Sequence, residues 1–246
     1  MSDEFRRAAD IIRGSAFLIS LTGAGISVES GIPDFRSAGG LWEKYDPAVY
    51  ASIDTFHRHP EKVWEMIFEM IDVTSSAAPN SAHRALARME EMGILKYIIT
   101  QNIDNLHQTA GSINVIEYHG NASRLECPGC GTESEVSAYD FAEKVPPRCD
   151  DCDKILKPSV IFFGEMIPHE AMMKSQELAE SADTVIVVGT SAVVYPAAGI
   201  PIVAKRNGAK IIEFNVMETD FTRSITDVFV GGMAGQTLPK LMEYLA

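Results

Sequence analysis

Four cysteines in one polar segment carry the clearest chemical signal in the sequence. Cys127 and Cys130 form one C-x2-C pair, and Cys149 and Cys152 form a second pair after eighteen intervening residues. Two such pairs at this separation are typical of a four-thiolate zinc site. A redox motif or disulfide bonds are the alternatives, and disulfides are disfavoured because we expect no export signal. Four protein ligands complete a tetrahedron, so we expect one structural Zn2+.

A glycine-rich loop is the second candidate site. The apolar run at 17–21 leads into TGAGIS, where Gly23 and Gly25 supply the first half of a dinucleotide-binding fingerprint. Val28 stands where the usual dehydrogenase fingerprint has its third glycine. The loop is either a tight turn or a dinucleotide site for chemistry other than hydride transfer. In the second case, Gly23 and Gly25 would let backbone N–H groups approach a pyrophosphate, and the small Ala24 would stay clear of it.

A histidine suited to proton transfer is the third candidate. A side chain with an ordinary pKa near 6.5 can act as a base at neutral pH. His119 follows an apolar run and precedes a glycine, whereas the other histidines lack this context: His57, His59, His83, His107 and His169. A lone histidine is more often structural, so both interpretations of His119 stay open at this point.

The elements that must position these residues are short apolar runs that alternate with helical segments. Runs rich in Val and Ile between helices of about a dozen residues predict an α/β fold, a parallel sheet with helices on both faces. Ligands of such sheets bind at the carboxyl ends of the strands. Polar signatures stand at those ends, at 22–27, 101–104, 119–121, 189–191 and 215. We expect helices at 3–13, 81–92, 169–182 and 200–207, and strands at 17–21, 97–100, 115–118 and within TVIVVGTS and AKIIEFNV.

The composition is that of a globular protein with an acidic surface. The 246 residues include 21 Lys and Arg and 34 Asp and Glu, for a formal net charge of −13. This charge disfavours nucleic acid and suits lysine-rich protein segments better. We expect no signal peptide, no membrane span and a cytoplasmic location. A zinc ribbon can also be a binding module, but its acidic residues would repel phosphate: Glu133, Glu135, Asp140, Glu143, Asp150, Asp151 and Asp153.

Several motifs occur together in one order: TGAGIS, GIPDFRS, TQNIDNLH, YHGN, the C-x2-C pairs, KPSVIFFGE, GTSAVVYPAA and FN. In this the chain resembles the sirtuins, the NAD-dependent protein deacylases, from about residue 5 to the C-terminus. The resemblance implies a Rossmann-like large part at 1–35, 79–122 and 158–246. It implies a small part formed by a helical insertion at 36–78 and the zinc ribbon at 123–157. NAD, as co-substrate, and an acyl-lysine protein or peptide would meet between the two parts. The oligomeric state stays open, and a monomer is compatible with the sequence.

The resemblance also assigns roles to residues. His119 would take a proton from a ribose hydroxyl, while Gln101 and Asn102 approach the ribose and its reacting water. Ile103 and Asp104 would line a nicotinamide pocket, although Asn102 and Asp104 could instead cap a helix. The remaining NAD contacts would be Gly23, Ala24, Gly25, Val28, Asp34, Phe35, Arg36, Gly189, Thr190, Ser191, Asn215 and Ala234. The substrate would contact Ile161, Phe162, Phe163 and Gly164. The segment Val160–Gly164 offers apolar walls and backbone groups that could pair with an extended peptide as an added strand, and the alternative is that it is a core strand.

One helix of the expected small part bears on the acyl group. Sirtuins that prefer succinyl or malonyl lysine carry a Tyr and an Arg three residues apart there. The sequence PEKVWEMIFEMIDV has no arginine and supplies Trp64, Met66, Ile67, Phe68 and Met70. An apolar pocket would leave an acyl carboxylate unpaired, so neutral acyl groups are expected. ADP-ribosyl transfer to protein and a non-catalytic zinc-ribbon module are the alternative functions.

Overall fold

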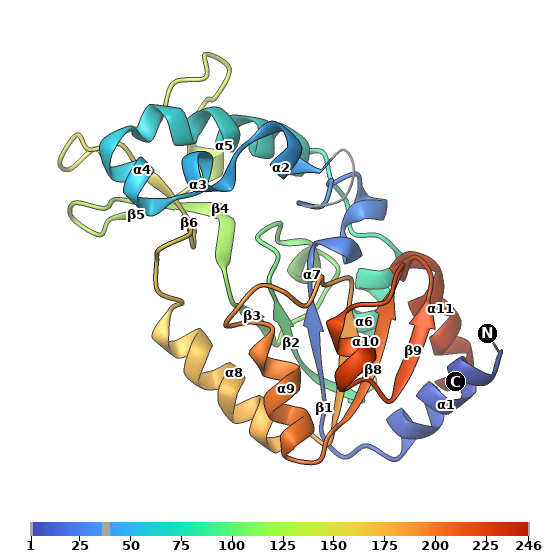
Figure 1. The fold of residues 1–246 in the computed structure, drawn as a ribbon. Coiled ribbons are helices and arrows are strands. Elements are labelled where there is room, and N and C mark those ends of the chain that lie inside the picture. The colour runs from blue at the N-terminus through green and yellow to red at the C-terminus, as the bar shows by residue number, and fades with distance from the viewer. Residues whose placement is uncertain (1, 36–39, 246) are drawn as a thin grey trace.

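The computed structural model describes residues 2–35 and 40–245, and at its centre is a six-stranded parallel sheet, here called the main sheet (Figure 1). The strand order is β3-β2-β1-β7-β8-β9. The chain proceeds outwards from β1 to β3 and then returns to β7, so a topological switch point lies between β1 and β7. The strands are β1 Leu18–Thr22, β2 Leu95–Thr100, β3 Val115–Glu117, β7 Thr184–Val188, β8 Lys210–Asn215 and β9 Val228–Gly231.

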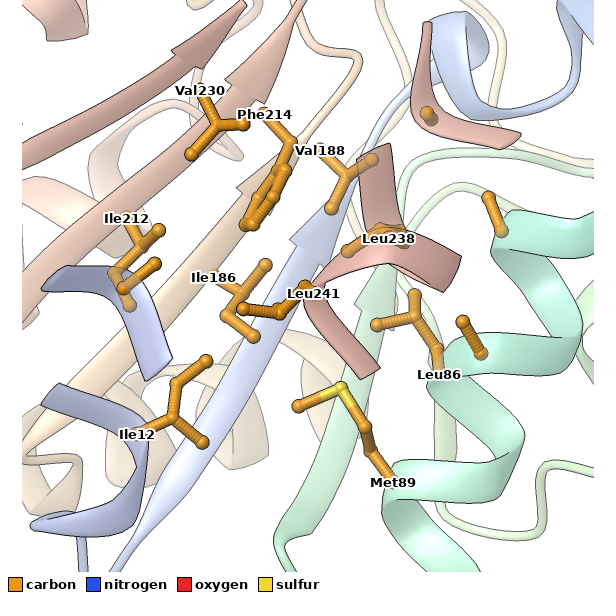
Figure 2. Close-up of a cluster of buried hydrophobic side chains, with 14 of the residues drawn as sticks. Ile12, Leu86, Met89, Ile186, Val188, Ile212, Phe214, Val230, Leu238 and Leu241 are labelled. Atoms are coloured by element: carbon orange, nitrogen blue, oxygen red, sulfur yellow. The ribbon is translucent and has the colours of Figure 1, made fainter. Parts of the chain in front are cut away.

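Helices cover both faces of the main sheet. Along β7, Ile186 and Val188 belong to one hydrophobic cluster and Val185 and Val187 to another, because successive strand side chains point to opposite faces. Helices α1, α6 and α11 complete the first cluster (Figure 2), and α8 and α9 complete the second. The helices are α1 Ser2–Arg13, α6 Ser81–Glu91, α7 Leu106–Thr109, α8 His169–Ser181, α9 Gly199–Arg206, α10 Asp220–Ser224 and α11 Ala234–Leu245, with 3-10 turns η1 Ala24–Ile26 and η2 Val28–Ser30.

A smaller layer lies across the carboxyl ends of the main strands (Figure 1). It contains an antiparallel sheet, here called the ribbon sheet, in the order β5-β4-β6. Trp64 and Phe68 pack with Leu125 and Cys149 in a core of their own, which supports the expected division into two parts; its boundaries stay a prediction. The elements are α2 Leu41–Lys44, α3 Pro47–Tyr50, α4 Ile53–Arg58, α5 Pro60–Ser75, β4 Gly120–Glu126, β5 Glu133–Glu135, η3 Val136–Ala138 and β6 Lys157–Val160.

The expected elements agree with the observed ones to within a few residues at each end. Helix α6, for example, starts after Asn80, whose side-chain oxygen accepts a hydrogen bond from the N–H of Ala82. The core-strand alternative for Val160–Gly164 holds only for Val160, because β6 ends there and Gly164 turns the chain with φ of 91°. Within 2–35 and 40–245, no helix combines the length and the apolar character needed to cross a bilayer.

Candidate active site

A cavity of about 790 Å3 lies between the carboxyl edge of the main sheet and the smaller layer. The structure brings nearly all of the predicted NAD and substrate residues to its wall. Asp104 does not line the cavity, and Arg36 lies outside the described residues. The predicted residues that line it are Gly23, Ala24, Gly25, Val28, Asp34, Phe35, Gln101, Asn102, Ile103, His119, Ile161, Phe162, Phe163, Gly164, Gly189, Thr190, Ser191, Asn215 and Ala234.

The glycine-rich loop is shaped by the close approach of two strand ends. A Cβ atom on Gly23 would lie 2.8 Å from the carbonyl oxygen of Gly189, and one on Gly25 would lie 2.7 Å from the Cα of Gly189. The N–H of Gly23 donates to the carbonyl of Val188 (3.0 Å), and the N–H of Gly25 donates to that of Gly189 (2.8 Å). These two N–H groups therefore hold the ends of β1 and β7 together, and the approach of other backbone N–H groups of the loop to a pyrophosphate stays a prediction. The placement of both glycines at bound NAD stays a prediction.

His119 sits in the turn between β3 and β4, on the cavity wall. Its Nδ1 lies 3.2 Å from the carbonyl oxygen of Gln101. A carbonyl oxygen only accepts, so Nδ1 carries the proton and the Nε2 lone pair is free to act as a base. Burial lowers the pKa of His119 below its ordinary 6.5, while the bond to Gln101 acts in the opposite direction. The imidazole is consequently neutral at pH 7.

Asn102 is held in one orientation by its amide nitrogen. Its Nδ2 donates to the carbonyl of Gly23 (3.2 Å) and to Oγ of Ser27 (3.1 Å). Both amide protons are thus engaged, and the side-chain oxygen remains as the available acceptor at the cavity wall. Asn102 does not cap α7, so the capping alternative is wrong for this residue.

Asp104 does take a capping role. One of its carboxylate oxygens accepts from the N–H of Leu106 (3.0 Å), and the other accepts from the hydroxyl of Ser27 (2.6 Å). Ser27 therefore links Asn102 to Asp104, a part that sequence reasoning missed because a buried serine within TGAGIS shows no periodic or charge signal. The role of Asp104 at nicotinamide stays a prediction.

The four cysteines form a compact metal site in the smaller layer. Their Sγ atoms all lie within 4.8 Å of one another. Cys127 and Cys152 are 3.4 Å apart at sulfur, and Cys130 and Cys149 are 3.5 Å apart. Tetrahedral zinc with Zn–S bonds near 2.3 Å requires sulfur separations of about 3.8 Å, close to the observed values. The four thiolates therefore fit one structural Zn2+.

Helix α5 supplies an apolar wall at the end of the cavity that lies within the smaller layer. Met66, Ile67 and Met70 line the cavity, together with Ile71 and Thr74 of the next turn. Trp64 and Phe68 face the ribbon instead, where the indole N–H of Trp64 donates to the carbonyl of Leu156 (3.0 Å).

Fold and site together define a class of protein: a doubly wound α/β chain with a four-thiolate ribbon and a ligand cavity between them. Comparison with known proteins gives the family. The Sir2 family model matches residues 23–196. An NAD-dependent protein deacylase from Thermococcus sibiricus is 46% identical over 240 residues, which are 96% of this chain and 94% of the relative. The chain belongs to the Sir2 family, which confirms its resemblance to the sirtuins.

Solved structures agree with this assignment over the whole chain. One, from work on the mechanism and regulation of Sir2 enzymes, has a TM-score of 0.93 and 47% identity, covering 100% of this chain and 98% of the other. Another is Sir2Af2 bound to a myristoylated histone peptide. It has a TM-score of 0.85 and 41% identity, and covers 100% of this chain and 97% of the other.

Proposed function

We propose that this protein is an NAD-dependent protein-lysine deacylase. It cleaves the bond between nicotinamide and ribose and transfers the acyl group of a lysine side chain to ADP-ribose. The products are nicotinamide, free lysine and O-acyl-ADP-ribose. The shared cavity carries this conclusion, because it joins His119, the loop after β7 at Gly189–Ser191 and the apolar segment Ile161–Gly164 in one volume.

The first step depends on positioning more than on acid–base chemistry. An acyl-lysine oxygen is a weak nucleophile, so it must be held against the ribose C1′ carbon in a site that excludes water. Phe35 and Phe162 contribute apolar surface to the cavity, and Gln101 is fixed beside it by a hydrogen bond from its Nε2 to Oγ1 of Thr190 (3.0 Å). These residues exclude water and orient the two substrates.

His119 and Asn102 act in the later steps. After nicotinamide leaves, a ribose hydroxyl must lose a proton to attack the acyl carbon, and Nε2 of His119 is the base that accepts it. Asn102 offers a fixed side-chain oxygen, which accepts a hydrogen bond from a ribose hydroxyl or from the water that completes the reaction. Thr190, Ser191, Asn215 and Ala234 hold the remainder of NAD; the side chain of Asn215 is itself oriented by the carbonyl of Thr190 (2.9 Å).

The acyl group that fits is neutral and longer than acetyl. Met66, Met70 and Thr74 line the cavity at successive turns of α5, and eight residues of helix extend about 12 Å. Leu125 and Val136 of the ribbon extend the same apolar wall. An acetyl group would occupy only its beginning. The similar Sir2Af2 was solved with a myristoylated peptide, which supports a long channel in this chain as well.

The direct test is incubation with NAD and an acylated-lysine peptide, followed by mass spectrometry. Deacylated peptide, nicotinamide and O-acyl-ADP-ribose in equal amounts are expected. ADP-ribosylated protein without deacylated peptide would instead establish a transferase. No release of nicotinamide from NAD with any peptide would leave only a zinc-ribbon binding module, and formation of NADH would indicate a dehydrogenase.

A further inference from the structure

Lys157 is a buried lysine at the start of β6, the strand that leads into the cavity-lining segment Ile161–Gly164. Its side chain is only 3% exposed. The ammonium lies 2.7 Å from the carbonyl oxygen of Val160 and 3.2 Å from that of Pro158. It also lies 3.1 Å from a carboxylate oxygen of Glu126 and 3.2 Å from one of Glu165. An ammonium has three protons, so all of its donor capacity is used inside the protein.

Phe162 contacts both Lys157 and Glu165, which form an ion pair with each other. The Nζ of Lys157 is 4.9 Å from the centroid of the Phe162 ring. The same Oε2 of Glu165 that meets the ammonium accepts the backbone N–H of Phe162 (2.7 Å). The ring and the backbone of one cavity-lining residue are therefore both restrained by the Lys157–Glu165 pair.

The neighbouring residues are restrained by other contacts. The N–H of Ile161 donates to the carbonyl of His119 (3.0 Å), and the N–H of Phe163 donates to that of Ala51 (2.8 Å). These two N–H groups are already paired within the protein, and strand addition by the remaining backbone groups of Val160–Gly164 stays a prediction. The side chains of this segment, above all Phe162, are therefore the groups that we expect a peptide to contact.

A contribution to stability alone does not account for such a pair. Replacing a buried ion pair by apolar residues of similar size is often neutral or stabilising, because desolvation offsets most of the attraction. A buried pair is better suited to fixing one geometry among several of similar packing energy. Here the geometry that it fixes is that of the wall against which the acyl-lysine side chain would lie.

We propose that Lys157 and Glu165 act as one positioning unit that holds Phe162 in the conformation required for binding of the acyl-lysine peptide. The inference rests on the proposed deacylase function. It predicts an effect on the peptide and not on the nucleotide, because the side-chain contacts of the unit are with Glu126 and with residues of the segment 157–165.

The test compares Lys157→Met and Glu165→Gln with Glu126→Gln. The last variant removes the other carboxylate near the same ammonium, and Glu126 is 41% exposed and absent from the cavity wall. Kd for an acetyl-lysine peptide is measured by fluorescence anisotropy, KM by turnover, and affinity for ADP-ribose by calorimetry. Loss of one charge-assisted contact predicts a roughly tenfold rise in peptide Kd and KM in the first two variants. Glu126→Gln should change neither by more than about twofold.

The double variant Lys157→Met with Glu165→Gln should raise peptide Kd no more than Lys157→Met alone, since members of one unit are not additive. If Lys157→Met does not fold, Glu165→Gln carries the comparison with Glu126→Gln. Unchanged peptide Kd in a folded variant overturns the inference, as does a parallel loss of ADP-ribose affinity. Wild-type turnover tests the deacylase function separately, and peptide binding remains measurable whatever its result.

Discussion

The Nε2 nitrogen of His107 lies 2.9 Å from the hydroxyl oxygen of Thr22 inside the protein. Thr22 donates its own proton to Oγ1 of Thr100 (2.9 Å), so it accepts from His107, whose proton is therefore on Nε2. Nδ1 is left as a buried acceptor without a hydrogen-bond partner in the described part of the chain. Burial lowers the pKa of His107 to about 3, and repulsion from a charged His83 acts in the same direction.

Acid should unfold this protein through its buried histidines. Burial also lowers the pKa of His83 to about 4. An unfolded histidine binds a proton near pH 6.5, so between that pH and about 4 the unfolded state holds more protons and the free energy of unfolding falls as pH falls. Each histidine contributes roughly 2 kcal/mol to the loss between pH 7.5 and pH 5. Urea unfolding at both pH values checks this, and His107→Asn should show a smaller loss; an equal loss would assign the effect to other groups.

Substitution His119→Ala should remove catalysis and leave the fold intact. The imidazole lines the cavity and is not part of a hydrophobic cluster. Loss of a positioned base should slow deacylation by about 10²- to 10⁴-fold. Exchange of labelled nicotinamide into NAD should suffer less, because the first bond cleavage needs no base. In the wild type, activity should be lost on acidification with a midpoint below pH 6.5, since burial lowers the pKa of His119. Wild-type deacylation by the variant would transfer the role to another group.

Gly25→Ala should separate the ends of β1 and β7. The new methyl group would meet Gly189 at 2.7 Å, so the backbone must move. Such overpacking costs about 1–3 kcal/mol of stability and should weaken ADP-ribose binding at the adjoining cavity. Gly199→Ala is the matched control, because nothing lies within 4 Å of the added atom. The melting temperature by calorimetry and the affinity for ADP-ribose by titration are compared between the two variants. Equal values would contradict the interpretation that Gly25 is required by the close approach of Gly189.

Met70→Trp should shorten the acyl channel. Met70 lines the cavity one turn beyond Met66, so a larger ring there should block a long chain and spare a short one. We expect kcat/KM for a myristoyl-lysine peptide to fall at least about tenfold, a barrier increase of roughly 1.4 kcal/mol, with acetyl-lysine changed less than about threefold. Ser75→Trp, at the exposed end of α5, is the control. Equal losses for both acyl lengths would place the chain elsewhere.

Cys149→Ala should loosen the smaller layer. Cys149 is buried in the same cluster as Trp64 and Leu125, so losing the metal removes both a cross-link and its packing. Activity should fall because Val160 and Phe162 belong to that cluster as well. Zinc content by atomic emission and hydrogen exchange of β4 and β6 provide the measurements. A metal-free variant with full activity and unchanged exchange would show that the metal is dispensable.

The sequence predicts the location of the site better than its details. Polar residues after apolar runs, such as Asn102, must meet at one edge because parallel strands share a direction. The pattern cannot show which of two uses a group serves. Gly25 allows the close approach of the backbone at Gly189, and Asp104 accepts a hydrogen bond from the N–H of Leu106 at the start of α7. Strand β9 was not anticipated, because VFVGG is too short to distinguish from a loop. Helix α11, which follows it, was not anticipated either. The sequence of an apolar helix such as α5 also does not show which face lines the cavity, the face that bears Trp64 or the face that bears Met66.

The sulfur separations in the ribbon also tie metal occupancy to redox state. Cys127 and Cys152 are 3.4 Å apart at sulfur and Cys130 and Cys149 are 3.5 Å apart, so removal of zinc would leave each pair a small movement from a disulfide bond. Two of the four thiols, those of Cys130 and Cys152, are open to dissolved oxygen. Chelation in air should therefore yield a disulfide-linked ribbon that does not bind zinc until a phosphine reductant restores the thiols. After chelation in the presence of reductant, addition of zinc alone should restore the metal site.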